Sequence, residues 1–282
     1  MTDRTDTSDT SDSTRSDPGI ADAPTLLRVV DGVATITLNR PANRNALSME
    51  LVGSLSGSLA HAISDPLVHV IVLTGAGSVF CAGADLKERR TVSAGGDEGG
   101  VPTFVRVFEQ ILDAPKPVVA KLNGSALAGG LGLACSCDLV IAPDTAMFGF
   151  TEVRIGVAPA IISVVCLPRL RFADAAELFL LGDRISAVEA QRFGLINRVV
   201  APAEIDAATA NVVGRLRLGG PNALAATKAI LNNGDREARR TAFQAMAKLS
   251  EGLFSSDEAN EGIRAFTEKR PASWTIAPSG AT

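Results

Sequence analysis

The sequence predicts an α/β protein whose last third is helical, and two observations carry this prediction. Between residues 68 and 142, short aliphatic runs alternate with segments in which apolar residues recur every three or four positions. Such alternation is typical of β/α units with parallel strands. From about residue 160 onward the helical spacing dominates. The length of 282 residues allows one large domain or two modest ones.

The composition is that of a folded protein of enzyme size. Hydrophobic residues make up 46% and charged residues 21% of the chain, which disfavours disordered, collagen-like and coiled-coil proteins. The formal net charge of −4 comes without a basic stripe, so we expect no nucleic-acid partner. We find neither a secretory leader pattern nor an apolar run of about 18 residues. The sequence therefore predicts a cytoplasmic protein that has no membrane partner.

Few residues are suited to histidine or metal chemistry. The chain has two histidines and four cysteines, and the spacing of Cys135 and Cys137 is not that of a zinc site. Without a secretory leader, nothing indicates an oxidising compartment in which disulfides would form. We therefore expect small buried thiols and no metal site.

Strands and helices alternate in the first half of the chain. Residues 1–24 are rich in Thr, Ser and Asp and are expected to form a disordered tail. Two β-rich runs, at 26–30 and 33–38, flank Asp31-Gly32 and predict a hairpin. The expected order is then a helix at 48–64, a strand at 68–73, a helix at 101–113, a strand at 117–121, a helix from 129 and a strand at 139–142. Since ligands bind outside the carboxyl ends of parallel strands, we expect a ligand near the loops after Leu73 and Leu122.

Helical spacing fills most of the second half. Helices are expected at 160–170, 173–181, 186–193, 203–217, 221–233, 236–254 and 257–269, with one short strand at 197–200. The predicted organisation is a tail at 1–24, a core at 25–200, a helical region at 201–274 and a tail at 275–282. The segment at 93–100, rich in glycine and acidic residues, is typical of a mobile loop.

Two glycine-rich segments follow predicted strands. In the first, residues 78–86, Asp85 fits the N-cap of a helix that starts at Leu86. In the second, residues 123–132, Gly129 stands where a helix begins, and exposed amides at such a position carry partial positive charge. Each segment alone is also compatible with a plain strand-to-helix turn, and the second is neither a P-loop nor a dinucleotide fingerprint. Together they could place two N–H groups around one developing oxyanion.

One carboxylate lies in an apolar run. Glu152 is flanked by residues 148–151 and 153–156, which are largely apolar or small. Such surroundings raise the pKa of a carboxyl group and suit it to general acid or base catalysis near neutral pH. An ion pair of Glu152 with Arg154 or another base is the alternative.

Four motifs, in this order along the chain, resemble those of the enoyl-CoA hydratase/isomerase family, the crotonase superfamily. The matching runs are 40–47, 81–86, 123–130 and 151–156, and residues 266–274 are similar to the usual C-terminal run of that family. The resemblance covers roughly residues 26–274. It implies a crotonase-like fold of the ClpP/crotonase type, a spiral of β/β/α units, in which the C-terminal helical region builds homotrimers that often pair into hexamers.

The resemblance also implies an activity and a set of site residues. The substrate is an acyl-CoA, as in fatty acid metabolism, and coenzyme A enters as the substrate thioester, with no metal or redox cofactor. Ala84 and Gly129 supply the two N–H donors of an oxyanion hole, and Glu152 is the acid/base. The CoA path is lined by Arg44, Ala46, Ala82, Asp85 and Leu86, and Lys269 or Arg270 contacts a CoA phosphate.

One departure from the family pattern bears on the reaction. Typical hydratases of the family have a first glutamate three residues after the oxyanion-hole glycine, where this chain has Gly132. A single carboxylate favours a Δ3-Δ2-enoyl-CoA isomerase, because it can lift a proton from one carbon and return it to another. However, residues 152–163 resemble hydratases of branched-chain or methylglutaconyl-type enoyl-CoA. We prefer the hydratase interpretation, and the isomerase and a non-catalytic acyl-CoA-binding protein remain alternatives.

Overall fold

The structure is a computed structural model that describes residues 22–88, 100–232 and 236–275. Residues 1–21 of the tail expected at 1–24, residues 93–99 of the loop expected at 93–100 and the last seven residues therefore lie outside the described residues, while Gly100 is the first residue of a helix. In the described part the predicted order of helices and strands is confirmed, and one additional sheet is present.

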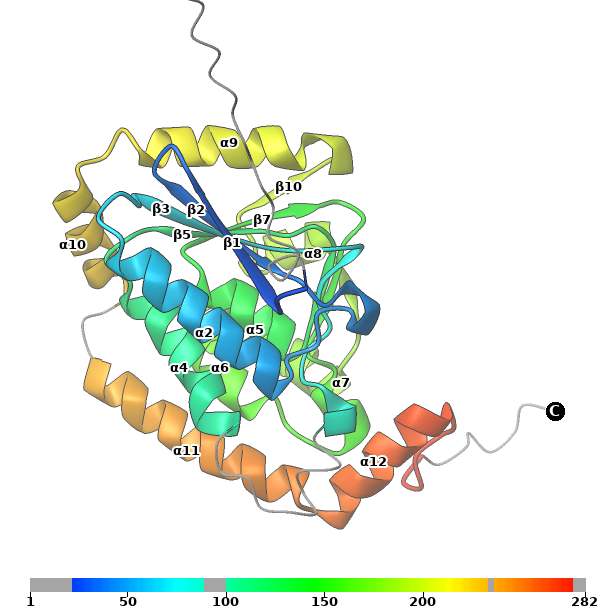
Figure 1. Cartoon of the computed structure of the whole chain (residues 1–282). Helices are drawn as coiled ribbons and strands as arrows, with labels where there is room; N and C mark the ends of the chain where they lie inside the picture. Colours follow the sequence, from blue (N-terminus) through cyan, green and yellow to red (C-terminus); the bar gives the residue numbers. More distant parts are fainter. Residues whose placement is uncertain (1–21, 89–99, 233–235, 276–282) are drawn as a thin grey trace, which may run out of the picture.

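Five of the six strands in the larger sheet are parallel, as the alternation predicts (Figure 1). The strand order is β1-β2-β3-β5-β7-β10. The bounds are Thr25–Val30 for β1, Val33–Leu38 for β2, Val70–Gly75 for β3, Val118–Lys121 for β5, Leu139–Pro143 for β7 and Arg198–Val200 for β10. The antiparallel hairpin of β1 and β2 turns at Asp31-Gly32, where both residues have positive φ, as a two-residue hairpin loop requires.

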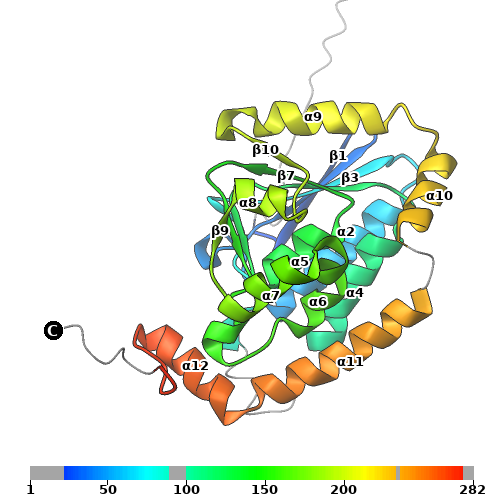
Figure 2. The same cartoon turned by 180° about the vertical axis from the view of Figure 1, so that it is seen from behind.

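Helices cover both faces of this sheet, as Figures 1 and 2 show. Ile71 and Leu73 of β3 point into the main core, which also includes residues of α2 (Met49–Ser64) and α4 (Gly100–Asp113). Val70 and Val72 point to the other face, where Val212 and Val213 of α9 (Ile205–Leu216) cover them. Burial on both faces explains why β3 is a continuous apolar run.

A second, four-stranded sheet has the order β4-β6-β8-β9. The residue patterns did not predict its strands, although the family resemblance implies β/β/α units. Its strands are β4 (Val79–Cys81), β6 (Ser125–Leu127), β8 (Met147–Gly149) and β9 (Ile185–Ser186). Strands of two or three residues are too short to show alternation. Because β4, β6 and β8 each follow a strand of the larger sheet, the chain repeats a β/β/α unit, as the crotonase-like spiral requires.

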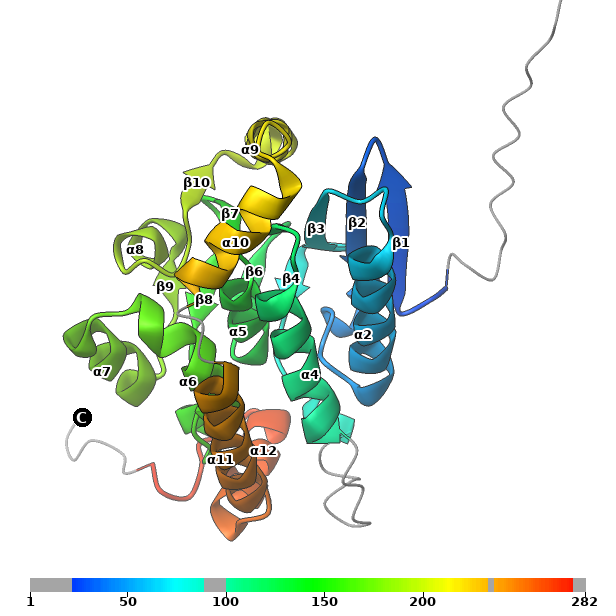
Figure 3. The same ribbon diagram turned by 90° about the vertical axis from the view of Figure 1, so that its left-hand side faces the viewer.

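The helices of the second half pack around this core. Their bounds are Gly129–Ser136 for α5, Ala160–Cys166 for α6, Phe172–Leu181 for α7, Ala187–Arg192 for α8, Pro221–Leu231 for α10, Arg236–Phe254 for α11 and Asp257–Glu268 for α12. Helix α11 lies against α4 and α6, and α12 lies against the short 3-10 helix η2 (Thr151–Ile155), at the lower edge in Figure 3. The contact with η2 is tight, because a Cβ on Gly262 would lie 2.4 Å from the carbonyl oxygen of Ile155. The division of the chain at residues 200 and 201 stays a prediction.

Among the residues that the structure describes, no helix combines the length and the apolar character that crossing a bilayer needs.

Candidate active site

A strap formed by residues 44–47 lies along residues 82–85. The Ala82 N–H donates to the Arg44 carbonyl at 3.1 Å, and the Leu47 N–H donates to the Gly83 carbonyl at 2.8 Å. Leu47 and Ala84 form an isolated parallel β-bridge. The structure therefore brings together the residues predicted to line the CoA path at the first glycine-rich segment: Arg44, Ala46, Ala82, Asp85 and Leu86.

The strap is held by Asn45, which the sequence analysis missed. This fully buried residue has a φ of 52°. Its Oδ1 accepts from the Arg40 N–H at 2.9 Å, and its Nδ2 donates to the carbonyls of Ala76 (3.0 Å) and Val79 (2.8 Å). The available signal is the residue type, because Asn tolerates the left-handed region better than most residues.

Asp85 is the helix N-cap that the sequence predicts. Its Oδ1 accepts from the N–H groups of Lys87 (3.0 Å) and Glu88 (3.2 Å). Its Oδ2 accepts from the Asn43 side-chain amide at 2.6 Å. This carboxylate thus fixes the start of the helix and the turn before the strap, while its contact with CoA stays a prediction.

The two amides predicted as oxyanion donors lie next to each other. An ideal Cβ on Gly129 would be 3.8 Å from the Ala84 nitrogen, although the two residues are far apart in sequence. Gly83, with a φ of +95°, allows this approach, because a Cβ there would lie 2.9 Å from the Ala128 Cβ. Neither the Ala84 N–H nor the Gly129 N–H donates a hydrogen bond to a described residue. Both are therefore available to a ligand oxygen.

Ala128 sets the direction of the second amide. Its φ of 50° and ψ of −126° are rare for a residue with a side chain. Its N–H donates to the Gly149 carbonyl at 2.9 Å, and its carbonyl accepts from Leu131 and Gly132, so the peptide is fixed on both sides. The bond to Gly149 also attaches the start of α5 to the segment that leads into η2.

Glu152 lies near the start of η2 with one carboxyl oxygen sealed from water. The residue as a whole is half-buried, but Oε2 has almost no exposed surface and no hydrogen-bond partner among the described residues. Burial raises the pKa of Glu152 to about 8, against a smaller lowering effect from its own backbone N–H. Arg154 instead pairs with Asp183 at 2.7 Å, so the predicted alternative of a Glu152–Arg154 ion pair is wrong.

Two adjacent free amides, and a carboxyl group whose pKa burial raises to about 8, are suited to acyl-thioester chemistry. The family model for enoyl-CoA hydratase/isomerase matches residues 28–276. The chain belongs to this family. The resemblance stated from the sequence motifs is thus confirmed.

Relatives and solved structures agree with the family assignment. A crystal structure of an enoyl-CoA hydratase from Mycobacterium avium is 38% identical, with a TM-score of 0.79, and the match covers 90% of this chain and 100% of that one. The crystal structure of carnitinyl-CoA hydratase from the same species is 33% identical, with a TM-score of 0.80, and the match covers 90% of this chain and 98% of that one. The crotonyl-CoA hydratase of Syntrophomonas wolfei subsp. wolfei is 34% identical over 251 residues, which are 88% of this chain and 96% of the relative. The crotonase-like fold is therefore confirmed.

The position at which the family pattern has a first glutamate is closed to any side chain. A Cβ on Gly132 would lie 2.3 Å from Cγ2 and 2.7 Å from Cβ of Ile162, a buried residue of α6. Such contacts require Ile162 to move. The sequence analysis noticed the glycine but not the side chain that occupies its space, because the contact joins two different helices.

The two C-terminal cations differ in their surroundings. Arg270 is engaged, since its guanidinium donates to Glu261 at 2.6 and 2.9 Å and to Glu268 at 2.7 Å. These carboxylates would compete with a CoA phosphate. Lys269 ends α12 with a φ of 55° and forms no ion pair with another described residue. Of the two predicted phosphate contacts, Lys269 is the one the structure leaves unengaged.

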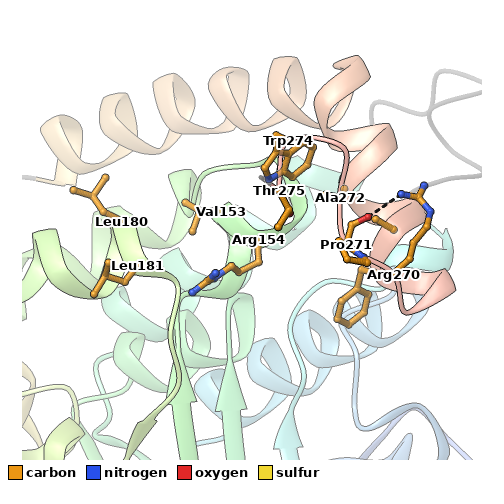
Figure 4. A pocket seen from close by; sticks show the side chains of 12 residues that line it. Val153, Arg154, Leu180, Leu181, Arg270, Pro271, Ala272, Trp274 and Thr275 are labelled. Atoms are coloured by element: carbon orange, nitrogen blue, oxygen red, sulfur yellow. Dashed lines mark hydrogen bonds between the residues drawn. The ribbon is translucent and has the colours of Figure 1, made fainter. Parts of the chain in front are cut away.

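A cavity of about 400 Å³ lies outside this site. Figure 4 shows it between η2, the end of α7 and the segment after α12, with Arg154, Leu180, Arg270 and Trp274 in its lining. Ala84, Gly129 and Glu152 do not line it. This cavity is therefore not part of the candidate active site.

All four cysteines are buried and unpaired, as predicted. Within the described ranges no group of three His, Cys, Asp or Glu side chains is placed to hold a metal ion.

Proposed function

We propose that the chain is an enoyl-CoA hydratase that adds water to a 2-enoyl-CoA with Glu152 as its single acid/base. The buried, unpartnered Oε2 of Glu152 carries this proposal, because an acyl-CoA binder has no need of a carboxyl group held in its neutral form. The names of two relatives, crotonyl-CoA hydratase and carnitinyl-CoA hydratase, support the same reaction type.

The proposed reaction uses three groups of this chain. The thioester oxygen accepts from the N–H groups of Ala84 and Gly129, which stabilise the negative charge of the enolate that forms as water adds. Glu152 enters protonated. As water bonds to C3, its proton passes to the unprotonated oxygen of Glu152, and the proton on the other oxygen of Glu152 passes to C2 of the enolate that forms, so Glu152 is regenerated and one water is added across the double bond. A single carboxyl group can do both only when the two additions occur on the same face of the double bond, which makes the addition syn.

A second candidate function is Δ3-Δ2-enoyl-CoA isomerisation. The observation that favours it is the contact of Gly132 with Ile162, which leaves no room for a second acid to hold water. In this reaction Glu152 enters as the carboxylate, removes a proton from C2 and returns it to C4, while the same two amides stabilise the dienolate.

One assay distinguishes these functions. We would incubate the full chain with 2-enoyl-CoA and 3-enoyl-CoA thioesters and identify the products by mass spectrometry. A hydratase forms 3-hydroxyacyl-CoA, an isomerase interconverts the two enoyl-CoA forms, and a binder forms no product.

Removal of the acid tests the role of Glu152. Glu152→Gln keeps the shape of the side chain but cannot transfer a proton, so turnover is expected to fall by about 10²–10⁴-fold. Glu177→Gln, at an exposed position on α7, is the matched control and should leave turnover unchanged. Turnover of Glu152→Gln near that of the control would show that Glu152 is not the acid/base.

A further inference from the structure

A second cavity, of about 280 Å³, lies where the end of α4, helix α10 and the start of α11 meet. Figure 1 shows α10 and the first turns of α11 at the left edge of the molecule. The cavity is separate from the candidate active site, since none of Ala84, Gly129 and Glu152 lines it. Its lining combines an apolar wall with several polar and charged groups. The apolar residues are Leu112, Ala114, Pro115, Ala225 and Ala229, and the others are Asp113, Lys228, Asn232, Arg236 and Arg239.

Two side chains of the lining attach α10 to the end of α4. Lys228 is 6% exposed, donates to the Ile111 carbonyl at 2.8 Å and pairs with Asp138 at 2.8 Å. The Asn232 side-chain amide donates to the Leu112 carbonyl at 2.8 Å. Because Asp138 is the counter-charge of Lys228, this lysine adds no net charge to the cavity. The walls are therefore preformed, and the charge that a ligand meets comes from the other side chains.

Two arginines of α11 share one carboxylate oxygen. Nε of Arg236 lies 3.2 Å from Oδ1 of Asp113, and Nη2 of Arg239 donates to the same oxygen. Among the described residues that line the cavity, Asp113 is the one acid. The next pair along the same two helices, Arg240 with Glu109 at 3.7 Å, is balanced. The cavity therefore has one positive charge more than its acid compensates.

The more buried of the two arginines has donors to spare. The side chain of Arg239 is 14% exposed, against 68% for that of Arg236. A guanidinium has five N–H donors, and Oδ1 of Asp113 is the acceptor that the described residues offer to Arg239. Because little water reaches this guanidinium, a second acceptor stabilises it more than it would stabilise an exposed one.

We infer that this cavity is a binding site for a small aliphatic carboxylate. The carboxylate accepts from the remaining N–H groups of Arg236 and Arg239, whose planar shape matches its two oxygens. Its single negative charge balances the single surplus positive charge, which a dianion such as phosphate would exceed. Its short hydrocarbon part packs against the wall formed by Leu112, Ala225 and Ala229. A volume of about 280 Å³ is just below the usual range of ligand pockets, about 300–1,000 Å³, so the ligand is small.

The first test asks whether the charge of the ligand matters. Butyrate and butyramide have nearly the same shape, but only butyrate is charged. Binding of each to the full chain can be followed by ligand-observed NMR at constant ionic strength, with inorganic phosphate as a third probe. We expect butyrate to bind saturably and at least about tenfold more tightly than butyramide, because it forms charge-assisted hydrogen bonds with both arginines. Absence of saturable butyrate binding, equal binding of butyramide, or tighter binding of phosphate would overturn the inference.

The second test locates the ligand. Arg239→Gln should weaken butyrate binding at least about tenfold, and Arg236→Gln, at a more exposed position, by about threefold. Arg236→Gln serves alone if Arg239→Gln does not fold. Arg240→Gln is the matched control, because Arg240 is 62% exposed on the same helix and does not line the cavity, and it should leave the affinity unchanged. Equal effects of Arg236→Gln and Arg240→Gln would show that surface charge alone attracts butyrate, and would contradict the site.

A third variant should change the affinity in the opposite direction. Asp113→Asn keeps both arginines and removes the acid, so the surplus rises from one positive charge to two. Butyrate should then bind about fivefold more tightly, because the like charge next to it is gone. Unchanged or weaker binding by the folded variant would show that the charge balance of this cavity does not govern binding. None of these variants alters Ala84, Gly129 or Glu152, so the results do not depend on the proposed enoyl-CoA function.

Discussion

At the scale of single residues, Glu152 is the position where stability and chemistry conflict. Its Oε2 is buried without a partner, which raises the pKa of this carboxyl group to about 8. A carboxyl group in such surroundings disfavours the folded state whenever it must ionise. The same burial keeps a proton available at neutral pH, which is what the proposed hydration needs.

This conflict predicts a pH dependence of stability. Between pH of about 4.5 and about 8 the unfolded chain has lost the Glu152 proton while the folded chain keeps it, so the free energy of unfolding falls as the pH rises through this window. Glu152→Gln lacks this titration. We expect the stability of the wild type relative to this variant to decrease by about 1–3 kcal/mol between pH 5 and pH 8. Urea unfolding of both proteins at each pH measures the difference, and parallel pH profiles would contradict the burial of Oε2.

The same carboxyl group predicts opposite pH–rate profiles for the two candidate reactions. Hydration needs Glu152 protonated, so kcat/KM should fall as the pH rises above about 8. Isomerisation needs the carboxylate, so kcat/KM should rise toward a plateau above that pH. Initial rates with a 2-enoyl-CoA and a 3-enoyl-CoA from pH 6 to pH 9.5 separate the two. A profile that is flat across this range for the active substrate would show that Glu152 does not titrate in the rate-limiting step.

At the scale of secondary-structure elements, the contact between α5 and α6 controls what the site can contain. Gly132 and Ile162 occupy one volume, so a substitution on one helix depends on the residue on the other. A glutamate at position 132, as in typical hydratases of the family, would supply a second acid, but its side chain requires space that Ile162 fills. The acid can be added only if Ile162 is also made smaller.

A double-mutant cycle tests this shared volume. Gly132→Ala alone should destabilise the protein by about 1–3 kcal/mol because the new Cβ collides with Ile162. Ile162→Ala alone should destabilise it by about 2–5 kcal/mol through the cavity that it leaves. The double variant should be more stable than the sum of these effects predicts, with a coupling energy of about 0.5–3 kcal/mol. Additive effects in denaturant unfolding would show that the two residues do not compete for space.

At the scale of the whole molecule, local sequence patterns predicted the larger sheet and the helices. They could not predict contacts between residues that are far apart in the sequence. The run 68–73 is apolar because β3 is buried on both faces, and this pattern is visible in the sequence. The second sheet was missed because β9 has only two residues and β4, β6 and β8 only three.

The candidate site was also predicted only in part. The positions of Ala84, Gly129 and Glu152 came from motifs, while their surroundings depend on residues distant in sequence. The role of Asn45 depends on two carbonyls more than thirty residues away, and the closure of Gly132 depends on a helix that begins at Ala160. Neither contact leaves a local pattern that periodicity could detect.

Exposed apolar side chains among the described residues indicate that the chain forms an oligomer. On α7, Phe172 is 89% exposed and Leu180 is 76% exposed. The exposed Trp274 lies across the cavity from Leu180 in Figure 4, and the exposed Phe266 also lines this cavity. Large apolar side chains gathered on one surface commonly mark a subunit interface, and closed cyclic symmetry would cover this surface on every copy. We therefore expect sedimentation at micromolar concentration to show a trimer or a pair of trimers.

Phe172→Asp with Leu180→Asp should shift the species toward the monomer, whereas Leu67→Asp, a control that is 73% exposed on the loop before β3, should not. A wild-type monomer, or equal effects of the two changes, would contradict assembly through α7.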